Sequence, residues 1–223
     1  MKSRFVHAGY ALEEDIHPIS DGSLEIATCD PDGNRIRFIQ YIPDALKSFG
    51  IEVLPPRTEN EHSLARRTSQ VSYNACSGVK MKHFYCEGLG LKLAKSLTYF
   101  DLLRRMEQQE SLTLEKHQEL EALEDLPWID FIEIVPHQYL ELFYTNGETK
   151  MNAGNLQDFC RYQHLCLEMD DIQKAWNAGR ANGLVPDSQI VKGADGALNF
   201  WLVDPDGNRI ELMQYIPGAK QLL

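Results

Sequence analysis

The stretch DPDGNRI at residues 204–210 decides the fold, because the same seven letters also stand at residues 30–36. The match resumes as QYIP at residues 40–43 and 214–217, so both segments recur 174 residues further along the chain. A long match that recurs once at a constant offset indicates two related modules, not a solenoid of many short units.

The repeated motif is typical of a β-hairpin. Proline presets the backbone for the first turn position, aspartate tolerates the next, and glycine supplies the positive φ at which the return strand begins. Residues 197–203 lead into the last copy and residues 209–215 lead out of it, and both runs resemble strands. The motif therefore predicts two antiparallel strands joined by a tight turn near each end of the chain.

The residues before the last hairpin predict a strand followed by a helix. Apolar and polar residues alternate over 162–169, which is the pattern of a half-buried strand. Asp170 and Asp171 are suited to cap a helix over 172–182, which Gly183 would end. The unit that closes the chain, at about 155–223, is therefore expected to run β-α-β-β-β.

The middle of the chain repeats this order. A strand at 70–75 precedes a short helix at 77–87. An insertion at about 100–127 is rich in Leu, Glu, Gln and Lys, which is the composition of one or two amphipathic helices. The remaining strands of this unit are expected at 91–99, 128–135 and 139–144.

These patterns divide the chain into four parts. The first part is incomplete, because it matches only the end of a helix and the hairpin, and a polar linker with a Pro-Pro pair follows it. The parts are a half-module at 1–48, the linker at 49–67, a β-α-β-β-β module with the helical insertion at 68–150, and a second such module at 151–223.

Composition limits the partners of the chain. Its 223 residues are 43% hydrophobic and 25% charged, and 22 basic against 33 acidic residues give a net charge of −11. An acidic chain without a basic run is a poor match for nucleic acid. No apolar stretch is long enough for a membrane span, and the first residues do not resemble a secretory signal. The five cysteines are odd in number and lack C-x-x-C spacing, so we expect a cytoplasmic protein with reduced thiols.

With these modules in view, three segments resemble the vicinal oxygen chelate superfamily, which contains glyoxalase I, the bleomycin-resistance proteins and the extradiol dioxygenases. They are FYCEGLGL at 84–91, YLELF at 139–143, and DPDGN at 204–208 with Glu211. The resemblance covers about residues 68–223. It implies an α+β fold in which paired β-α-β-β-β modules form a cup-shaped, mostly antiparallel sheet with helices packed outside.

The resemblance also implies one divalent transition metal (Zn, Ni, Co, Mn or Fe), held by one residue from the first and one from the last strand of each module. Carried onto this sequence, the ligands are Gln70, Glu141, His164 and Glu211. Arg37 stands where the repeat places Glu211, so the first half-module is not expected to bind metal.

Strand alternation supports this set in part. A glutamate on an inward strand face is costly unless it is paired or coordinated, which favours a role for Glu141 and Glu211. A single histidine is more often a satisfied core residue than a ligand, so His164 by itself decides nothing. Whether module 68–150 pairs with module 151–223 of the same chain stays open at this point.

Two functions follow from the resemblance. The first is a metal-dependent lyase or isomerase of the glyoxalase I type, acting on a small α-hydroxycarbonyl or thiol adduct through an enediolate, with Glu211 or Glu141 moving the proton. Asn74 stands where such proteins have a glutathione-binding arginine, which puts glutathione in doubt. The basic residues that could replace that arginine are Lys150, Arg161 and Lys192.

The second function is a non-catalytic protein that sequesters a small molecule, as bleomycin-resistance proteins do. It would need aromatic walls in the cup and no metal. Both functions require a small-molecule partner, and a homodimer is possible because the half-module leaves strand edges unpaired. The candidate wall residues are Tyr73, Tyr139, Phe143, Phe200, Trp201 and Tyr215.

Overall fold

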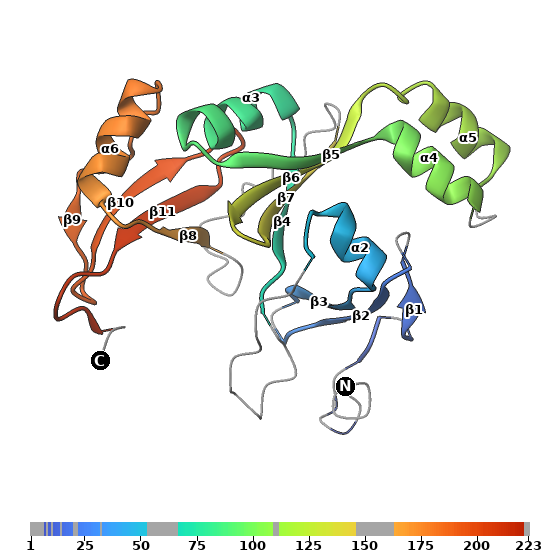
Figure 1. The fold of residues 1–223 in the computed structure, drawn as a ribbon, viewed down its shortest axis with the longest axis horizontal. Helices are drawn as coiled ribbons and strands as arrows, with labels where there is room; N and C mark the ends of the chain where they lie inside the picture. Colours follow the sequence, from blue (N-terminus) through green and yellow to red (C-terminus); the bar gives the residue numbers. More distant parts are fainter. Residues whose placement is uncertain are drawn as a thin grey trace.

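The computed structural model describes residues 11–13, 15–19, 22–31, 33–52, 67–108, 112–145 and 163–220, together with residues 7 and 9. The fold is α+β and contains three sheets, one for each unit of the sequence. Most strand pairs are antiparallel, and the helices pack on the outside of the sheets (Figure 1). The fold class that the family resemblance implies is confirmed.

The N-terminal sheet holds the first copy of the repeated hairpin. Its turn is built as predicted, because Gly33 has a φ of 82° and the Asp30 carboxylate accepts a hydrogen bond from the backbone N–H of Asn34. A short helix follows the hairpin. The elements are β1 (His17–Pro18), β2 (Leu24–Cys29), β3 (Arg35–Gln40) and α2 (Pro43–Ser48).

The middle sheet contains four strands in which the first and last along the chain are parallel neighbours. Each strand lies within two residues of its expected bounds. They are β4 (Gln70–Ala75), β5 (Lys92–Thr98), β6 (Pro127–Val135) and β7 (Gln138–Tyr144), in the order β4-β7-β6-β5.

The helix expected after β4 consists of two pieces. The first, α3 (Gly78–Lys82), is a regular α-helix, and the second, η1 (His83–Gly88), is a π-helical turn. Both Phe84 and Tyr85 are buried within the π-helical turn. A π-turn inserts one residue into the helical repeat, which a sequence pattern based on 3.6 residues per turn does not reveal.

The insertion forms the two helices expected there, α4 (Tyr99–Gln108) and α5 (Leu114–Glu121). The Tyr99 hydroxyl donates to the backbone carbonyl of Tyr144 at 3.0 Å and so ties α4 to the end of β7. Figure 1 shows this pair of helices at the far end of the molecule from the C-terminal strands. In this position the insertion does not cover the C-terminal sheet.

The C-terminal sheet repeats the plan of the middle sheet. Its helix is capped by Asp171, whose carboxylate accepts from the backbone N–H of Lys174 at 2.9 Å, as predicted. The elements are β8 (His164–Glu168), α6 (Ile172–Ala181), β9 (Val191–Lys192), β10 (Leu198–Val203) and β11 (Arg209–Gln214), with strand order β8-β11-β10-β9.

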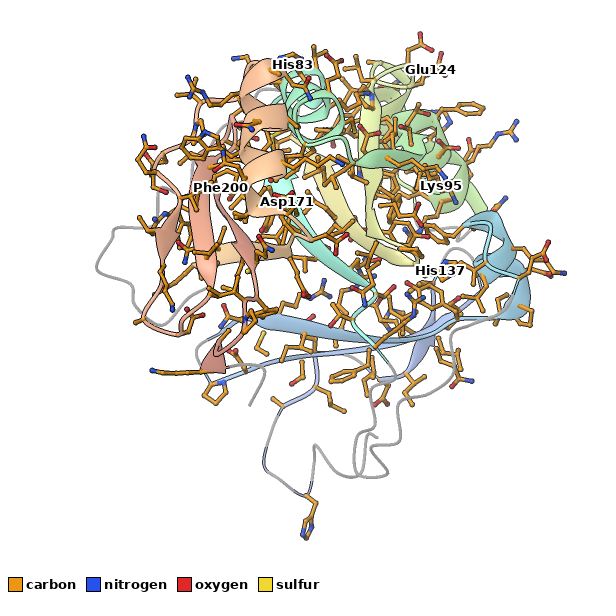
Figure 2. The ribbon with its side chains drawn as sticks, turned by 60° about the vertical axis from the view of Figure 1, so that its left-hand side comes forward. His83, Lys95, Glu124, His137, Asp171 and Phe200 are labelled. Atoms are coloured by element: carbon orange, nitrogen blue, oxygen red, sulfur yellow. The ribbon has the colours of Figure 1, made fainter. Side chains whose placement is uncertain are left out.

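The middle and C-terminal sheets share one hydrophobic core. It runs from Leu140 and Leu142 on β7 to Leu212 on β11, beneath the neighbouring helices. The helices α3, η1 and α6 lie side by side over this core (Figures 1 and 2), and Phe200 on β10 packs under Trp176 of α6 with ring centroids 5.1 Å apart. The two modules therefore pack side by side, and the opposite sheet faces are left to carry polar residues.

The N-terminal hairpin docks on the face of the middle sheet opposite the helices, which carries a second hydrophobic cluster beside Glu141. Phe49, just after α2, packs against Phe131 and Tyr139 with centroid distances of 5.3 Å in both cases. The Tyr41 hydroxyl lies 2.9 Å from the Ser69 hydroxyl. The half-module thus closes the cup of the middle module within one chain. Most of the predicted linker (53–66) lies outside the described residues.

Candidate functional site

His164 and Glu211 form the polar centre of the C-terminal sheet. Strands β8 and β11 run parallel, with Cys166 opposite Glu211 and His164 opposite Arg209. Side chains two residues apart on a strand share a face, so His164 and Glu211 point to the same side. The His164 Nε2 and Glu211 Oε2 atoms are 3.2 Å apart.

Asn199 on β10 holds the other oxygen of this glutamate. Its Nδ2 donates to Glu211 Oε1 at 2.8 Å, and both residues are buried. The Asn199 Oδ1 atom is buried and has no hydrogen-bond partner among the described residues. A buried acceptor without a partner is costly unless a ligand or water satisfies it. Asn199 therefore both orients Glu211 and leaves an unused acceptor at the site.

This pair fits two ligands of a transition metal. Two donors that each stand about 2.0–2.1 Å from a tetrahedral ion are roughly 3.3 Å apart. The separation of Nε2 and Oε2 is close to that value. The hydrogen bond from Asn199 to Glu211 is the kind of support that keeps a carboxylate ligand in place. Two donors are half of the four that a protein zinc site usually supplies.

Gln70 and Glu141 form the second pair, on the middle sheet. Glu141 Oε2 accepts from Gln70 Nε2 at 2.6 Å and from Ser72 Oγ at 2.5 Å. Arg37 of the N-terminal hairpin reaches the same oxygen, with its Nη1 at 4.0 Å. The Arg37 guanidinium also pairs with the buried carboxylate of Glu25, with an Nε to Oε2 distance of 3.0 Å.

Charge decides the chemistry of this second pair. Burial raises the pKa of Glu141, while the Ser72 hydrogen bond and the Arg37 charge oppose that rise. The single positive charge of the Arg37 guanidinium is shared between the Glu25 and Glu141 carboxylates, and it offsets part of their negative charge. A divalent ion would face both the repulsion of Arg37 and the loss of its ion pairs. With Arg37 in this place, the Gln70–Glu141 pair is less suited to a metal ion than the His164–Glu211 pair is.

The structure does not bring the four predicted ligands together within one chain. Across the described residues, no group of three or more His, Cys, Asp and Glu side chains is placed to hold a metal ion, so Glu141 does not join His164 and Glu211. The strand registers explain why the sequence predicted a single set of four ligands. Gln70 and His164 hold equivalent places in their sheets, as do Glu141 and Glu211, but each pair faces a different cup.

Other side chains line the face that carries His164. The edge of the His164 ring meets the Trp201 indole, with centroids 4.9 Å apart, and the Arg209 guanidinium lies 4.2 Å from the centroid of that indole. Burial, together with the nearby Glu211 carboxylate, raises the pKa of Cys166 to about 12, so this thiol is not a nucleophile at neutral pH.

Burial decides which of the predicted wall residues and basic residues can contact a ligand. Tyr73, Tyr139 and Phe200 belong to the cores, so they are not walls of a pocket. Trp201 is partly exposed beside His164. Among the basic residues considered for glutathione, Lys192 is exposed on β9, and Lys150 and Arg161 lie outside the described residues.

Sequence reasoning missed Asn199 and Glu25, and it did not find the contact between Arg209 and Trp201. The signal was available in the repeat, because Glu25 and Asn199 stand at equivalent positions, as do Arg37 and Glu211. Both hairpins thus place a hydrogen-bonded pair on the same two strand positions. The repeat does not predict which residue faces each pair, which is Glu141 for Arg37 and His164 for Glu211.

The geometry defines a protein built from repeated β-α-β-β-β units, with a polar pair on the face opposite the helices. The family model of the Glyoxalase/Bleomycin resistance protein/Dioxygenase superfamily matches residues 69–212. The chain belongs to this superfamily, whose members bind small molecules and typically hold a metal ion. The comparison with curated proteins gives no match.

A solved glyoxalase I structure shows the same fold at low identity, and two further structures are similar over part of the chain. A glyoxalase I variant from Zea mays is 17% identical, with a TM-score of 0.60, and the match covers 96% of this chain and 63% of the maize chain. A glyoxalase/dioxygenase from Nostoc punctiforme is 18% identical over 74% of this chain and 99% of its own, with a TM-score of 0.47. A lactoylglutathione lyase from Agrobacterium tumefaciens is 15% identical over 68% and 96%, with a TM-score of 0.44. The chain therefore spans less than two thirds of the maize protein.

The described helices include none that is both long and apolar enough to cross a membrane.

Proposed function

We propose that the chain is a metal-dependent lyase or isomerase of the glyoxalase I type, acting on a small α-hydroxycarbonyl compound or thiol adduct through an enediolate. The observation that carries the proposal is the His164–Glu211 pair, with donor atoms 3.2 Å apart and Asn199 fixing the second carboxylate oxygen. A divalent transition metal would supply a Lewis acid that stabilises negative charge on two neighbouring substrate oxygens.

Glu211 is the proposed base of this chain. Its Oε1 is held by Asn199, so its Oε2, which lies 3.2 Å from His164 Nε2, is the atom that would leave that contact to take a proton from the carbon next to the substrate carbonyl. Glu211 would return the proton to the neighbouring carbon. Glu141, the other carboxylate expected to move the proton, has its Oε2 engaged by Gln70 and Ser72 and its charge matched by Arg37.

A second copy of the chain is the proposed source of the missing donors. The Gln70–Glu141 pair of any copy is closed by its own Arg37, so the pair that a second copy offers is again a histidine and a glutamate. Two such faces would give two imidazoles and two carboxylates, and one metal for two chains. The prediction that Gln70, Glu141, His164 and Glu211 share one metal stays a prediction, and the metal analysis that closes the Discussion separates the two arrangements.

Exchange of substrate hydrogen tests the function. The protein, loaded in turn with Ni, Co, Mn and Zn, would be incubated in D₂O with methylglyoxal hemithioacetals and with hydroxyacetone, and followed by NMR. We expect isomerisation with solvent deuterium entering at carbon. Glu211→Gln should abolish this exchange. Glu168→Gln, which changes a carboxylate on the same strand face as Cys166, is the control and should retain the exchange. Absence of exchange with every metal, or full exchange in Glu211→Gln, would overturn the proposal.

A sequestering protein is the second candidate. The observation that favours it is that one described chain offers two donors, and not a group of three. It predicts tight binding of small aromatic compounds next to Trp201 without metal and without turnover, which the same NMR samples would reveal.

A further inference from the structure

The Arg209 guanidinium lies at the edge of the proposed site, and it forms no ion pair with an acidic residue in the described part of the chain. The guanidinium lies over the face of the Trp201 indole, with its central carbon 4.2 Å from the ring centroid. Trp201 in turn meets His164, and His164 meets Glu211. Four neighbouring side chains thus run from a carboxylate–imidazole pair, over an aromatic ring, to an unpaired positive charge.

The repeat contains a second example of this arginine. Arg35 in the N-terminal hairpin stands where Arg209 stands in the C-terminal one. The Nε of Arg35 donates to both oxygens of the Glu13 carboxylate, at 3.1 and 2.8 Å. The chain therefore shows, at the equivalent position, that this arginine holds a carboxylate when one is in reach.

The C-terminal hairpin lacks that internal carboxylate. Glu13 donates its backbone N–H to the carbonyl of Ala27, and Asp187 does the same to Trp201, so residues 13 and 187 are equivalent. The side chain of Asp187 is one methylene shorter, and no ion pair joins it to Arg209 in the described part of the chain. The ring of Trp201, which replaces Ala27, holds the guanidinium instead.

We infer that Arg209 binds a carboxylate of the substrate, so that the substrate class is an anionic α-hydroxycarbonyl compound or thiol adduct. The inference rests on the proposed function, because it names a group of the same substrate. Arg209 lies two residues before Glu211 on the same strand face, beside His164, so a carboxylate there would be on a molecule that also reaches the His164–Glu211 pair. Stacking on Trp201 restricts the arginine side chain before the ligand arrives, which lowers the entropy cost of binding.

This site would matter for a chain with a net charge of −11, because most of its surface repels anions. An arginine paired with a carboxylate makes a charge-assisted hydrogen bond that is stronger than a neutral one. At this exposed position, we expect a preference of about tenfold for a carboxylate over the matching amide.

Binding of a matched pair of stable thioethers tests the inference without turnover. The probes are 3-(methylthio)propionate and 3-(methylthio)propionamide, which differ only in charge at one end. The readout is the chemical shift of the Trp201 indole N–H during NMR titration of the full chain. We expect the carboxylate to bind about tenfold more tightly than the amide, Arg209→Gln to remove the difference, and Arg209→Lys to retain part of it.

Arg35→Gln is the matched control, because it removes the equivalent arginine of the other hairpin and should leave the preference unchanged. Equal binding of the two probes to the wild-type chain, or a preference that survives in Arg209→Gln, would overturn the inference. The outcome is independent of catalysis. A chain without metal or turnover but with the preference would refute the proposed function alone, and an active chain without the preference would refute the role of Arg209 alone.

Discussion

The two copies of the hairpin carry opposite charges at the same place. In the N-terminal copy, Arg37 lies between the carboxylates of Glu25 and Glu141. In the C-terminal copy, Glu211 takes the place of Arg37, and its described partners are Asn199, His164 and the thiol of Cys166. One hairpin brings its own cation and closes a cup, and the other presents an acid that a cation from outside can satisfy. The difference teaches that the sign of the charge at one strand position decides whether the chain's own arginine or the neighbouring His164 faces the pair.

Removal of the built-in cation should have the largest effect on stability. Arg37→Ala would leave Glu25 and Glu141 buried without their positive partner. Because the arginine side chain is itself 29% exposed, we expect a loss of about 2–3 kcal/mol in the free energy of unfolding, below the value for a fully buried pair. Urea denaturation would measure it.

Arg35→Ala is the matched control for this variant. Its ion pair with Glu13 is mostly solvent-exposed, so its loss should cost at most about 1 kcal/mol. Equal losses for the two variants would show that Arg37 does not lock the hairpin onto the middle sheet.

The turn aspartates give a smaller contrast between the hairpins. Asp204 is buried and accepts hydrogen bonds from the backbone of Asn208 at 2.8 Å and from the Tyr85 hydroxyl at 2.8 Å. Asp30 makes the equivalent bond to Asn34, but this aspartate is only half-buried. We expect Asp204→Asn to cost about 2 kcal/mol and Asp30→Asn less than about 1 kcal/mol, measured by thermal unfolding. A reversed order would mean that Asp204 does not join the two modules as the structure places it.

The most modest effect is on pH dependence. Because burial raises the pKa of Glu141 above its ordinary value of 4.5, the folded chain holds this proton more tightly than the unfolded chain does. The wild type should therefore lose stability relative to Glu141→Gln as the pH rises from about 4.5 towards neutrality. Urea denaturation of both proteins across this range measures the difference. A difference that grows in favour of the wild type over the same range would show that Arg37 outweighs burial at Glu141.

The sequence predicted the elements well because its signals are local. The DPDGNRI repeat, the alternation over 162–169 and the Asp171 cap each fix a hairpin, a strand or a helix start by short-range physics. The sequence did not predict the π-helical turn at His83–Gly88, because one extra residue in a helix changes the periodic pattern of apolar residues very little.

The sequence predicted the residues of the candidate site but not how they are grouped. Strand alternation and family resemblance located Gln70, Glu141, His164 and Glu211, and the structure pairs the first two and the last two. Alternation fixes which face of a strand a residue lies on, but not which sheet covers that face. The docking of the N-terminal hairpin on the middle sheet depends on contacts such as Phe49 with Tyr139, which no local pattern encodes.

Metal analysis tests the contrast between the two hairpins most directly. Wild type, Glu211→Gln and Glu141→Gln would be purified without chelator, loaded with the same transition metal, and measured for metal per chain after gel filtration. We predict about one metal for two wild-type chains, the same content in Glu141→Gln, and none in Glu211→Gln. If Glu141→Gln lost its metal as completely as Glu211→Gln, or if Glu211→Gln kept it, the assignment of the metal to the His164–Glu211 face would be wrong.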